Sequence, residues 1–475
     1  MGKRITVISI FLCCLMQYSV AQNLYRLERL NSFSTRTHWE LAPVTYADGL
    51  VFLSNRPTNS FVDYGDSENR EFSNMYYVAR EGDGWGAPEI FSESFMSNYH
   101  DGPATFAQDG SIICLARAYL VETDDGGRLT NPNSGLYFAS KVGEEWTDLE
   151  SYEHNDPAYA FYTPHLADQG QTLYFSANLE DTRGGFDIYV SRMVQGRWTE
   201  PENLGDNINT SEDDLYPFLH PTGRMYFSSK GHDAFGGSDI FYSNFVEGKW
   251  TPAEKMETPI NSGSDDYALI LSEDFSNGYF TSKRVGGSPD IYSFKSTFPS
   301  FQFPRPIQKN RFCFRLRENS LDTIDYNTFA YEWVINDTLK LYGHDIKFCF
   351  PGPGEYELSF NVTNKVTDTI MYDVASLVLN LEFIQQPVIS APDTVYQNQL
   401  VLLSAEESYV PDFEIEGYYW DFGFGDKKEG IEVEHYFTEP GTHRVILGLV
   451  ERVRRRFEPE KKAVYKEIVV LPEPE

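Results

Sequence analysis

The chain has 475 residues, too many for one hydrophobic core, so we expect two to four domains. Aromatic residues make up 15% of it and 35 Gly and 25 Pro accompany them, a composition that excludes a disordered chain and favours short strands joined by turns. The formal net charge of −32 repels nucleic acid and anionic lipid, which excludes both as partners.

Residues 1–21, "MGKRITVISIFLCCLMQYSVA", have the features of a secretory signal peptide. Two basic residues precede an apolar stretch, which ends in a cleavage site of small residues at Ser19-Val20-Ala21. The apolar stretch is too short to span a bilayer, and no later run is long enough, so we expect no transmembrane segment. The sequence therefore predicts an exported protein, in the periplasm, with the cell surface or an outer-membrane association as the alternative.

A repeat dominates the region that follows, residues 22–298. The stretch "GGFDIYVSRMVQGRW" at 184–198 returns as "GGSDIFYSNFVEGKW" at 236–250, with eight of fifteen positions identical. Such units recur at residues 40–97, 98–154, 155–211, 212–263 and 264–296, and periods of this length are typical of propeller blades. The last repeat is short, and "NLYRLERL" near the N-terminus is expected to supply its missing outer strand. We predict an all-β fold with a five-bladed β-propeller, six blades being the alternative.

Acidic residues recur at fixed places in these repeats. Asp187, Asp239 and Asp290 each follow a Gly-rich turn and are expected to tie it by accepting N–H groups. A second set precedes the first strand of a repeat and is expected at one mouth of the ring: Asp101, Asp213, Asp214, Asp265 and Asp266. This second set either caps turns or forms a binding patch for a cationic partner or a cation such as calcium, because crowded carboxylates repel unless neutralised. The repeated Trp146, Trp198 and Trp250 are expected to pack between blades.

After residue 298 the pattern changes to two runs of short strands, 299–385 and 386–475, each of which predicts a β-sandwich. The two runs share a phrase, "YEWVI" with "FCFPGPGEYELSFNV" in the first and "YYWDF" with "HYFTEPGTHRVILGL" in the second. Their aromatic residues Trp333 and Trp420 are expected in the two cores. Cys313 and Cys349 lie in expected strands and form a candidate disulfide, whose oxidation the sequence leaves open.

The sequence contains none of the common catalytic or phosphate-binding motifs, and its nine His show no metal-ligand spacing. We therefore predict no catalytic residues, no cofactor and no enzyme activity.

Two resemblances to known families rest on these motifs. The "GGxDIYxS…GxW" unit with its following "LYFSS" strand resembles the PD40, or TolB-type WD40-like, propeller repeat over residues 40–296. The stretch "YYWDFGFGDKKEGIEVEHYFTEPGTHRVILGLV" resembles a PKD domain, and residues 299–385 resemble a degenerate copy of one, so the resemblance implies two Ig-like PKD sandwiches. Chains with both modules are similar to envelope proteins of gliding and type IX-secreting Gram-negative bacteria. That resemblance implies a binding or scaffold protein whose partners are envelope proteins, including the secretion or gliding machinery. Two alternatives stay open: an exported glycan-active hydrolase or lyase that uses the propeller channel, and a surface adhesin with a PKD stalk.

Overall fold

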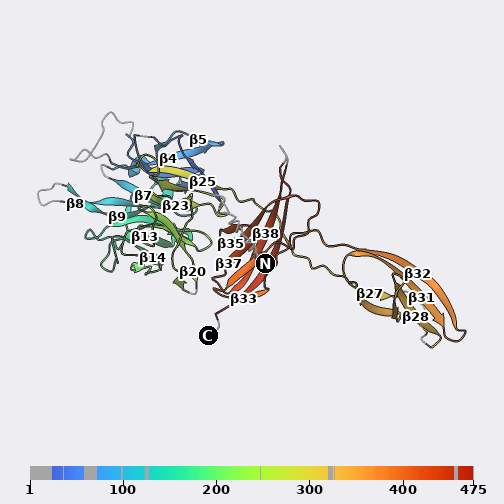
Figure 1. Ribbon diagram of the computed structural model, residues 1–475. Helices are drawn as coiled ribbons and strands as arrows, with labels where there is room; N and C mark the ends of the chain where they lie inside the picture. Colours follow the sequence, from blue (N-terminus) through green and yellow to red (C-terminus); the bar gives the residue numbers. More distant parts are fainter. Residues whose placement is uncertain are drawn as a thin grey trace, which may run out of the picture. The chain divides into compact units, whose positions relative to one another are not determined.

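The computed structural model describes residues 24–473 except 36, 58–71, 98–99, 123–127, 247, 319–324, 326 and 454–457. The predicted signal segment 1–21 therefore lies outside the described residues. Within them the chain is all-β, with two single-turn 3₁₀ helices, η1 (Glu93–Phe95) and η2 (Asp168–Gly170). None of the described segments forms a helix long and apolar enough to cross a membrane. The chain divides into two compact units, residues 1–298 and 299–475, which are described separately (Figure 1).

The described residues of the first unit form five large antiparallel sheets, each built around three consecutive long strands with a short outer strand. The first sheet consists of β2 (Glu40–Tyr46), β3 (Gly49–Ser54), β4 (Asn74–Glu81), β5 (Gly84–Trp85) and β6 (Glu89–Ile90). The second consists of β7 (Asp101–Phe106), β8 (Ile112–Glu122), β9 (Arg128–Val142), β10 (Glu145–Trp146) and β11 (Glu150–Ser151). The third consists of β12 (Phe161–Ala167), β13 (Thr172–Ala177), β14 (Asp187–Val194), β15 (Arg197–Trp198) and β16 (Glu202–Asn203).

The last two sheets complete the unit. The fourth consists of β17 (Asp214–Leu219), β18 (Met225–Ser229), β19 (Asp239–Ser243) and β22 (Glu254–Lys255), beside a small ribbon of β20 (Phe245–Val246) and β21 (Lys249–Trp250). The fifth consists of β23 (Asp266–Leu271), β24 (Asn277–Ser282), β25 (Asp290–Ser296) and β1 (Tyr25–Arg29). β1 pairs with β25 from Tyr25 opposite Ser296 to Arg29 opposite Tyr292, so the N-terminal segment does supply the outer strand of the last sheet.

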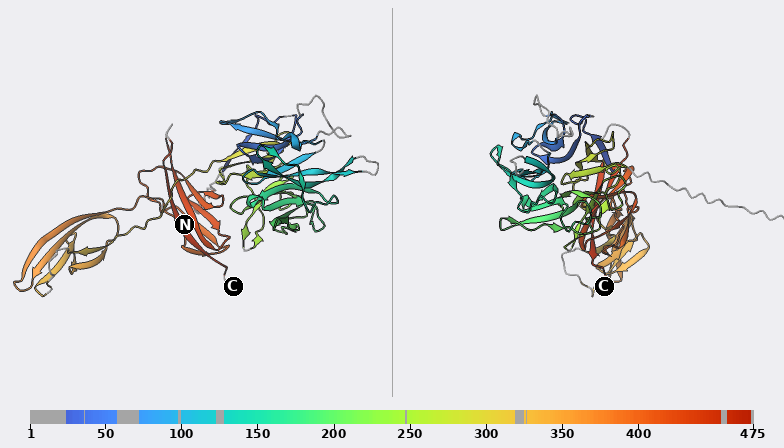
Figure 2. Two further views of the ribbon diagram at one scale, coloured as in Figure 1. Left: turned by 180° about the vertical axis from the view of Figure 1, so that it is seen from behind. Right: turned by 90° about the vertical axis from the view of Figure 1, so that its left-hand side faces the viewer.

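The five first strands form a closed ring, which makes the unit propeller-like. Each of β2, β7, β12, β17 and β23 contacts the next, and β23 contacts β2. Figure 2 shows the sheets following one another from blue to yellow-green. The core lies between neighbouring sheets; Leu166 and Phe175 of the third, for example, pack in one cluster with Leu136 of the second.

The second unit contains two strand groups, each with a large sheet and a two-stranded sheet. The first group has β29 (Leu339–Tyr342), β28 (Phe329–Ile335), β31 (Gly354–Asn364) and β32 (Thr369–Leu381) in one sheet, and β27 (Cys313–Arg317) with β30 (Asp345–Cys349) in the other. The second group has β26 (Arg305–Pro306), β39 (Lys461–Leu471), β38 (Gly441–Glu451), β35 (Ile415–Gly423), β36 (Asp426–Glu429) and β33 (Thr394–Tyr396) in one sheet, and β34 (Leu400–Ser404) with β37 (Glu432–Tyr436) in the other. Because β26 pairs with β39, the strands of the first group are inserted in sequence between two strands of the second.

The two groups differ in how well they are packed. Trp420 is fully buried among the core residues of the second group, and its indole N–H donates to the carbonyl of Gly430 at 2.7 Å. Trp333, at the matching place in the first group, is only half-buried and packs on Phe360 with ring centroids 4.6 Å apart. The expectation of a core tryptophan therefore holds for Trp420 and only in part for Trp333.

Candidate functional site

The repeated acids close the loops that lead into the strands. Asp101, Asp214 and Asp266 open the first strands of three sheets, and each carboxylate accepts the backbone N–H of the residue four positions earlier, at 2.9, 2.6 and 2.7 Å. Asp187 and Asp239 open third strands and do the same, toward Arg183 at 3.0 Å and toward Phe235. A carboxylate placed there satisfies a turn N–H that would otherwise lack a partner. These five acids take the predicted turn-capping role, whereas Asp290, predicted to do the same, pairs with Arg29 of β1 at 2.7 Å.

Three of the first-strand acids are also buried beside an arginine. Glu40, Asp101 and Asp266 are at most 1% exposed, and their oxygens lie 2.8, 2.5 and 2.6 Å from the guanidinium nitrogens of Arg56, Arg117 and Arg284 respectively. Burial is the largest influence on Glu40 and raises the pKa of that carboxyl to about 7, although the guanidinium works in the opposite direction.

Asp214 differs from these three acids. Arg56 and Arg284 each stand two residues after the end of the second strand of their sheet, and in the fourth sheet that position is Gly231. Asp214 is fully buried, and burial raises the pKa of its carboxyl to about 6. The backbone N–H and the hydroxyl of Thr210 both donate to Oδ2 of Asp214. These two hydrogen bonds hold the carboxyl where the sheets of those three acids use an arginine.

Asp213 and Asp265, the first members of the two acidic pairs, join neighbouring sheets. Their carboxylates pair with Lys230 at 2.5 Å and Lys283 at 2.6 Å. Each also lies on the backbone of a glycine in the preceding sheet, Gly185 and Gly237 respectively, so closely that a Cβ on the glycine would collide with Oδ1.

The residue that follows in each pair continues the same junction through its backbone. The N–H of Asp214 donates to the carbonyl of Phe186, and the N–H of Asp266 to the carbonyl of Ser238, both at 2.7 Å. The Gly-Gly motif of one repeat and the acidic pair of the next are therefore two halves of one junction between sheets.

The expected binding patch does not form as an open surface. Of its five residues, Asp101, Asp214 and Asp266 are buried, while Asp213 and Asp265 are partly exposed and engaged by lysines. Within the described ranges, no three His, Cys, Asp or Glu side chains come together as metal ligands would. The structure therefore gives the calcium hypothesis no support, because the carboxylates are neutralised by the protein's own cations and N–H groups.

The channel of the first unit is narrow. The first strands enclose a cavity of about 50 Å³, lined by Ala42–Val44, Pro103–Thr105, Thr163–His165, Tyr216–Phe218 and Ala268–Ile270. Every first strand carries a β-bulge at this point, and the bulge residue has a positive φ.

The bulges also join the sheets to one another. The N–H of Ala42, Tyr216 and Ala268 donates to a hydroxyl of the preceding sheet, at 3.0, 3.1 and 3.2 Å. The sequence analysis missed these hydrogen bonds between sheets, although four of the five repeats have a proline directly after the bulge residue.

The repeated tryptophans pack between sheets as expected. Trp146 lies 6.3 Å from Tyr46 of the first sheet, and Trp198 lies 5.4 Å from Phe138 of the second, between ring centroids. Trp85 packs in the same way on Tyr279 of the fifth sheet, beside a cavity of about 490 Å³. The guanidinium of Arg80 lies over the Trp85 indole at 4.7 Å, so that face of the ring is already occupied.

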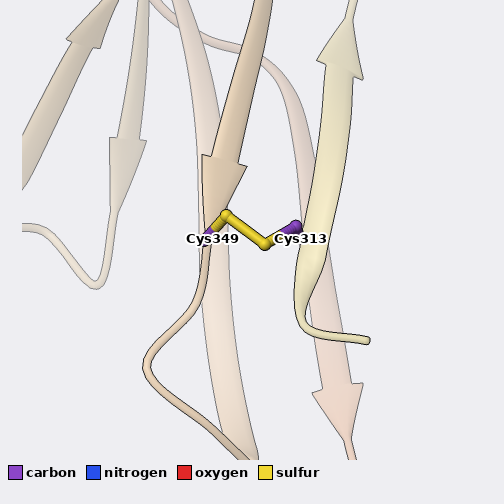
Figure 3. Close-up of a disulfide and its surroundings, with 2 residues drawn as sticks. All are labelled: Cys313 and Cys349. Carbon is purple, nitrogen blue, oxygen red and sulfur yellow. A yellow bond between two sulfur atoms is a disulfide. The ribbon is translucent and has the colours of Figure 1, made fainter. Parts of the chain in front are cut away.

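In the second unit Cys313 and Cys349 form a disulfide (Figure 3). They are directly opposite each other in the ladder between β27 and β30, which the bond fastens together. Cys114 of the first unit is free and fully buried, as an apolar residue would be.

Residues 384–450 match the family model described as PKD domain. They cover most of the second strand group, including the buried Trp420. The resemblance of this part of the chain to PKD domains is therefore confirmed.

Several solved structures are similar to the chain at low identity. The Bacteroides ovatus xyloglucan protein GH43B is 10% identical with a TM-score of 0.34, the match covering 93% of this chain and 92% of that one. The exo-β-1,3-galactanase 1,3Gal43A of Clostridium thermocellum is 8% identical with a TM-score of 0.34, over 90% of this chain and 95% of that one. A prolyl endopeptidase structure is 10% identical with a TM-score of 0.30, and the match to it covers 78% of this chain and only 55% of that one.

These similarities correct the prediction that the chain is not an enzyme. The solved structures similar to it include glycosidases and peptidases, which contradicts the prediction of no enzyme activity. Identities of 8 to 12% and TM-scores below 0.5 assign no reaction or substrate to this chain.

Proposed function

We propose that this chain is an exported protein of the cell envelope that binds a partner protein, with a five-bladed PD40-type propeller followed by two Ig-like PKD sandwiches. Five sheets with five contacting first strands support the blade count. The N-terminal signal-like segment supports export, and the disulfide between β27 and β30 supports an oxidising compartment, for which we propose the periplasm.

The observation that supports the binding function is that the ring keeps its repeated acids internal and encloses only a small cavity, which leaves its two ends for recognition. The acids of the repeats are used to hold loops and sheets together, and the first strands leave a cavity of only about 50 Å³ between them. Recognition is therefore assigned to the two ends of the ring. Exposed apolar side chains stand at both, with Phe235 and Val285 in the loops before third strands, and Val142 and Val194 at the hairpins of the opposite end.

Photo-cross-linking in the native host tests this function. A photoreactive amino acid replaces Phe235 or Val285 at one end, and Val142 or Val194 at the other, all of which are more than half exposed. We expect both positions of one end to capture the same envelope protein and both positions of the other end to capture none. A failure to capture any protein reproducibly from all four positions would refute the proposal.

Hydrolysis of an envelope glycan is the second candidate, and one observation favours it. The solved structures similar to the chain include glycosidases. The test is release of reducing ends from isolated envelope polysaccharide by the purified chain. Reproducible turnover would make hydrolysis the function; no turnover with any fraction would refute it.

A further inference from the structure

The strand β32 is an exposed apolar edge. It is the last strand of its sheet and pairs only with β31 in the part of the chain that the structure describes. Its first ten residues are all exposed, and Tyr372, Val374, Leu377 and Val378 are exposed by 68, 55, 58 and 52%. Figure 1 shows β32 at the outer edge of its strand group. A long apolar edge of this kind presents unpaired backbone groups that another strand can join.

The second strand group shows what occupies the matching edge. There the strand that corresponds to β32 is β39, as the shared phrases of the two groups indicate. β39 pairs with β38 on one side and, on the other, in parallel with β26 and β33. Val395 of β33 is 3% exposed, so the added segment contributes an alternate apolar side chain to the core. β32 lacks such a covering segment within the described residues.

We propose that β32 receives an extended segment of a partner protein as an added strand, a recognition mode that combines backbone hydrogen bonds with pockets for alternate side chains. The inference goes beyond the binding function proposed above: it adds a second contact site, in the other unit, and names the chemistry of the segment bound there. Between Gly354 and Glu382 the sequence holds five acids and one lysine, and Glu355 and Glu357 are exposed on the neighbouring β31. The partner segment therefore has alternating apolar residues and basic residues at its ends. A second copy of this chain would bring the same negative edge, so a different protein is the occupant.

The regular part of the edge fixes where the segment binds. A bulge interrupts the pairing with β31 at Asp373, which has a φ of 52° and donates its N–H to Asn361 at 2.9 Å. A bulge and a charge both discourage strand addition, so the N-terminal third of β32 is protected. Residues 374–381 carry no charge and follow a regular ladder. A partner segment of about eight residues matches that length at about 3.3 Å per residue.

The test uses a synthetic peptide of alternating valine and threonine with two lysines at each end, and fluorescence anisotropy with the purified full chain. We expect binding that weakens about tenfold when the flanking lysines are replaced by glutamates and about tenfold in the Leu377→Lys variant, because like charges oppose docking. The matched control is Leu402→Lys, at a leucine that is 55% exposed on β34, and it should bind as the unaltered chain does. Circular dichroism verifies that both variants are folded.

Three outcomes would overturn the inference. Equal binding of the peptide by the Leu377→Lys and Leu402→Lys variants would show that it binds away from β32. No binding by the unaltered chain would show that β32 does not accept an added strand. A chain that is dimeric in solution and becomes monomeric on Leu377→Lys would make a second copy the occupant. Because the cross-linking positions on the ring lie in the other unit, capture there with no peptide binding here would refute this inference and leave the proposed binding function standing.

Discussion

Replacing Arg284 with methionine should destabilise the first unit by removing the cation beside a buried carboxylate. Asp266 is fully buried, and its Oδ1 accepts from Arg284 at 2.6 Å. In the variant Oδ2 keeps its two hydrogen bonds from Ser262, whereas Oδ1 and the carbonyls of Pro259 and Ile260 lose their donor. Removing one partner of a buried ion pair costs about 3–5 kcal/mol, and the two retained hydrogen bonds favour the lower end, about 3 kcal/mol.

The assay is differential scanning calorimetry of the full chain, in which the transition of the second unit serves as an internal reference. A loss of about 3 kcal/mol lowers the Tm of a unit of this size by about 6–12 °C. The matched control is Arg192→Met, which breaks a pair with Glu202 at 3.0 Å in which both side chains are about half exposed or more. Exposed pairs contribute little, so its Tm should hardly change. Equal Tm values for the two variants would refute the argument that these buried pairs hold the ring.

Three further predictions follow from the same contacts. Burial raises the pKa of the Asp214 carboxyl to about 6, above its unfolded value, so this group adds stability at low pH that is lost as the pH rises through 6. The unaltered chain should therefore gain about 2–3 kcal/mol in free energy of unfolding between pH 7 and pH 4 from this group, measured by urea unfolding. The Asp214→Asn variant should lack that gain, and an unchanged pH dependence would contradict the prediction. Gly237→Ala should cost about 1–3 kcal/mol in the same assay, because the new Cβ meets Asp265. Gly263→Ala, whose Cβ meets only the Phe235 ring at an ordinary contact distance of 3.8 Å, should cost little; equal costs would be the contrary result. The disulfide Cys313–Cys349 closes a separation of 36 residues, so its reduction should lower the free energy of unfolding of the second unit by about 3–4 kcal/mol. The Tm of the first unit should not change. A calorimetric trace that does not respond to reductant would show that the bond contributes no stability.

The sequence predicted the repeating strands because each repeat contains recognisable turn residues between its strands. In the first four sheets the glycine of the third-to-fourth-strand hairpin has a positive φ that favours glycine, and a tryptophan follows it two or three residues later, as with Gly196 and Trp198. The unpaired last repeat predicted the return of β1 to β25 because an open ring would expose a strand edge. The short outer strands and the insertion of one strand group within another could not be predicted, because two-residue strands such as β26 leave no pattern in sequence.

The candidate site was only half predictable. Repetition located the acids correctly at the loops before the strands, and their loop-closing hydrogen bonds follow from that position. Their neutralisation was missed because the cationic partners come from the next strand or from just after it, 16 to 18 residues later in the sequence. A signal was present in "SNR" at 54–56 and "SKR" at 282–284, where an arginine recurs at one place in the repeat. An acid and an arginine that recur together at fixed positions predict an internal ion pair more directly than a binding patch.

Function is better sought where related segments differ than where they agree. The Gly-Gly motifs and acidic pairs recur because every junction between sheets has the same geometry, so their repetition follows from packing alone. β32 and β39 are the strands that follow the second shared phrase in their groups, yet β39 carries Lys461, Lys462, Lys466 and Glu467 and is covered by two added strands, whereas β32 carries one acid. Exposed apolar side chains on an edge strand invite aggregation unless a partner covers them. The departure of β32 from its internal counterpart therefore points to a surface kept for binding.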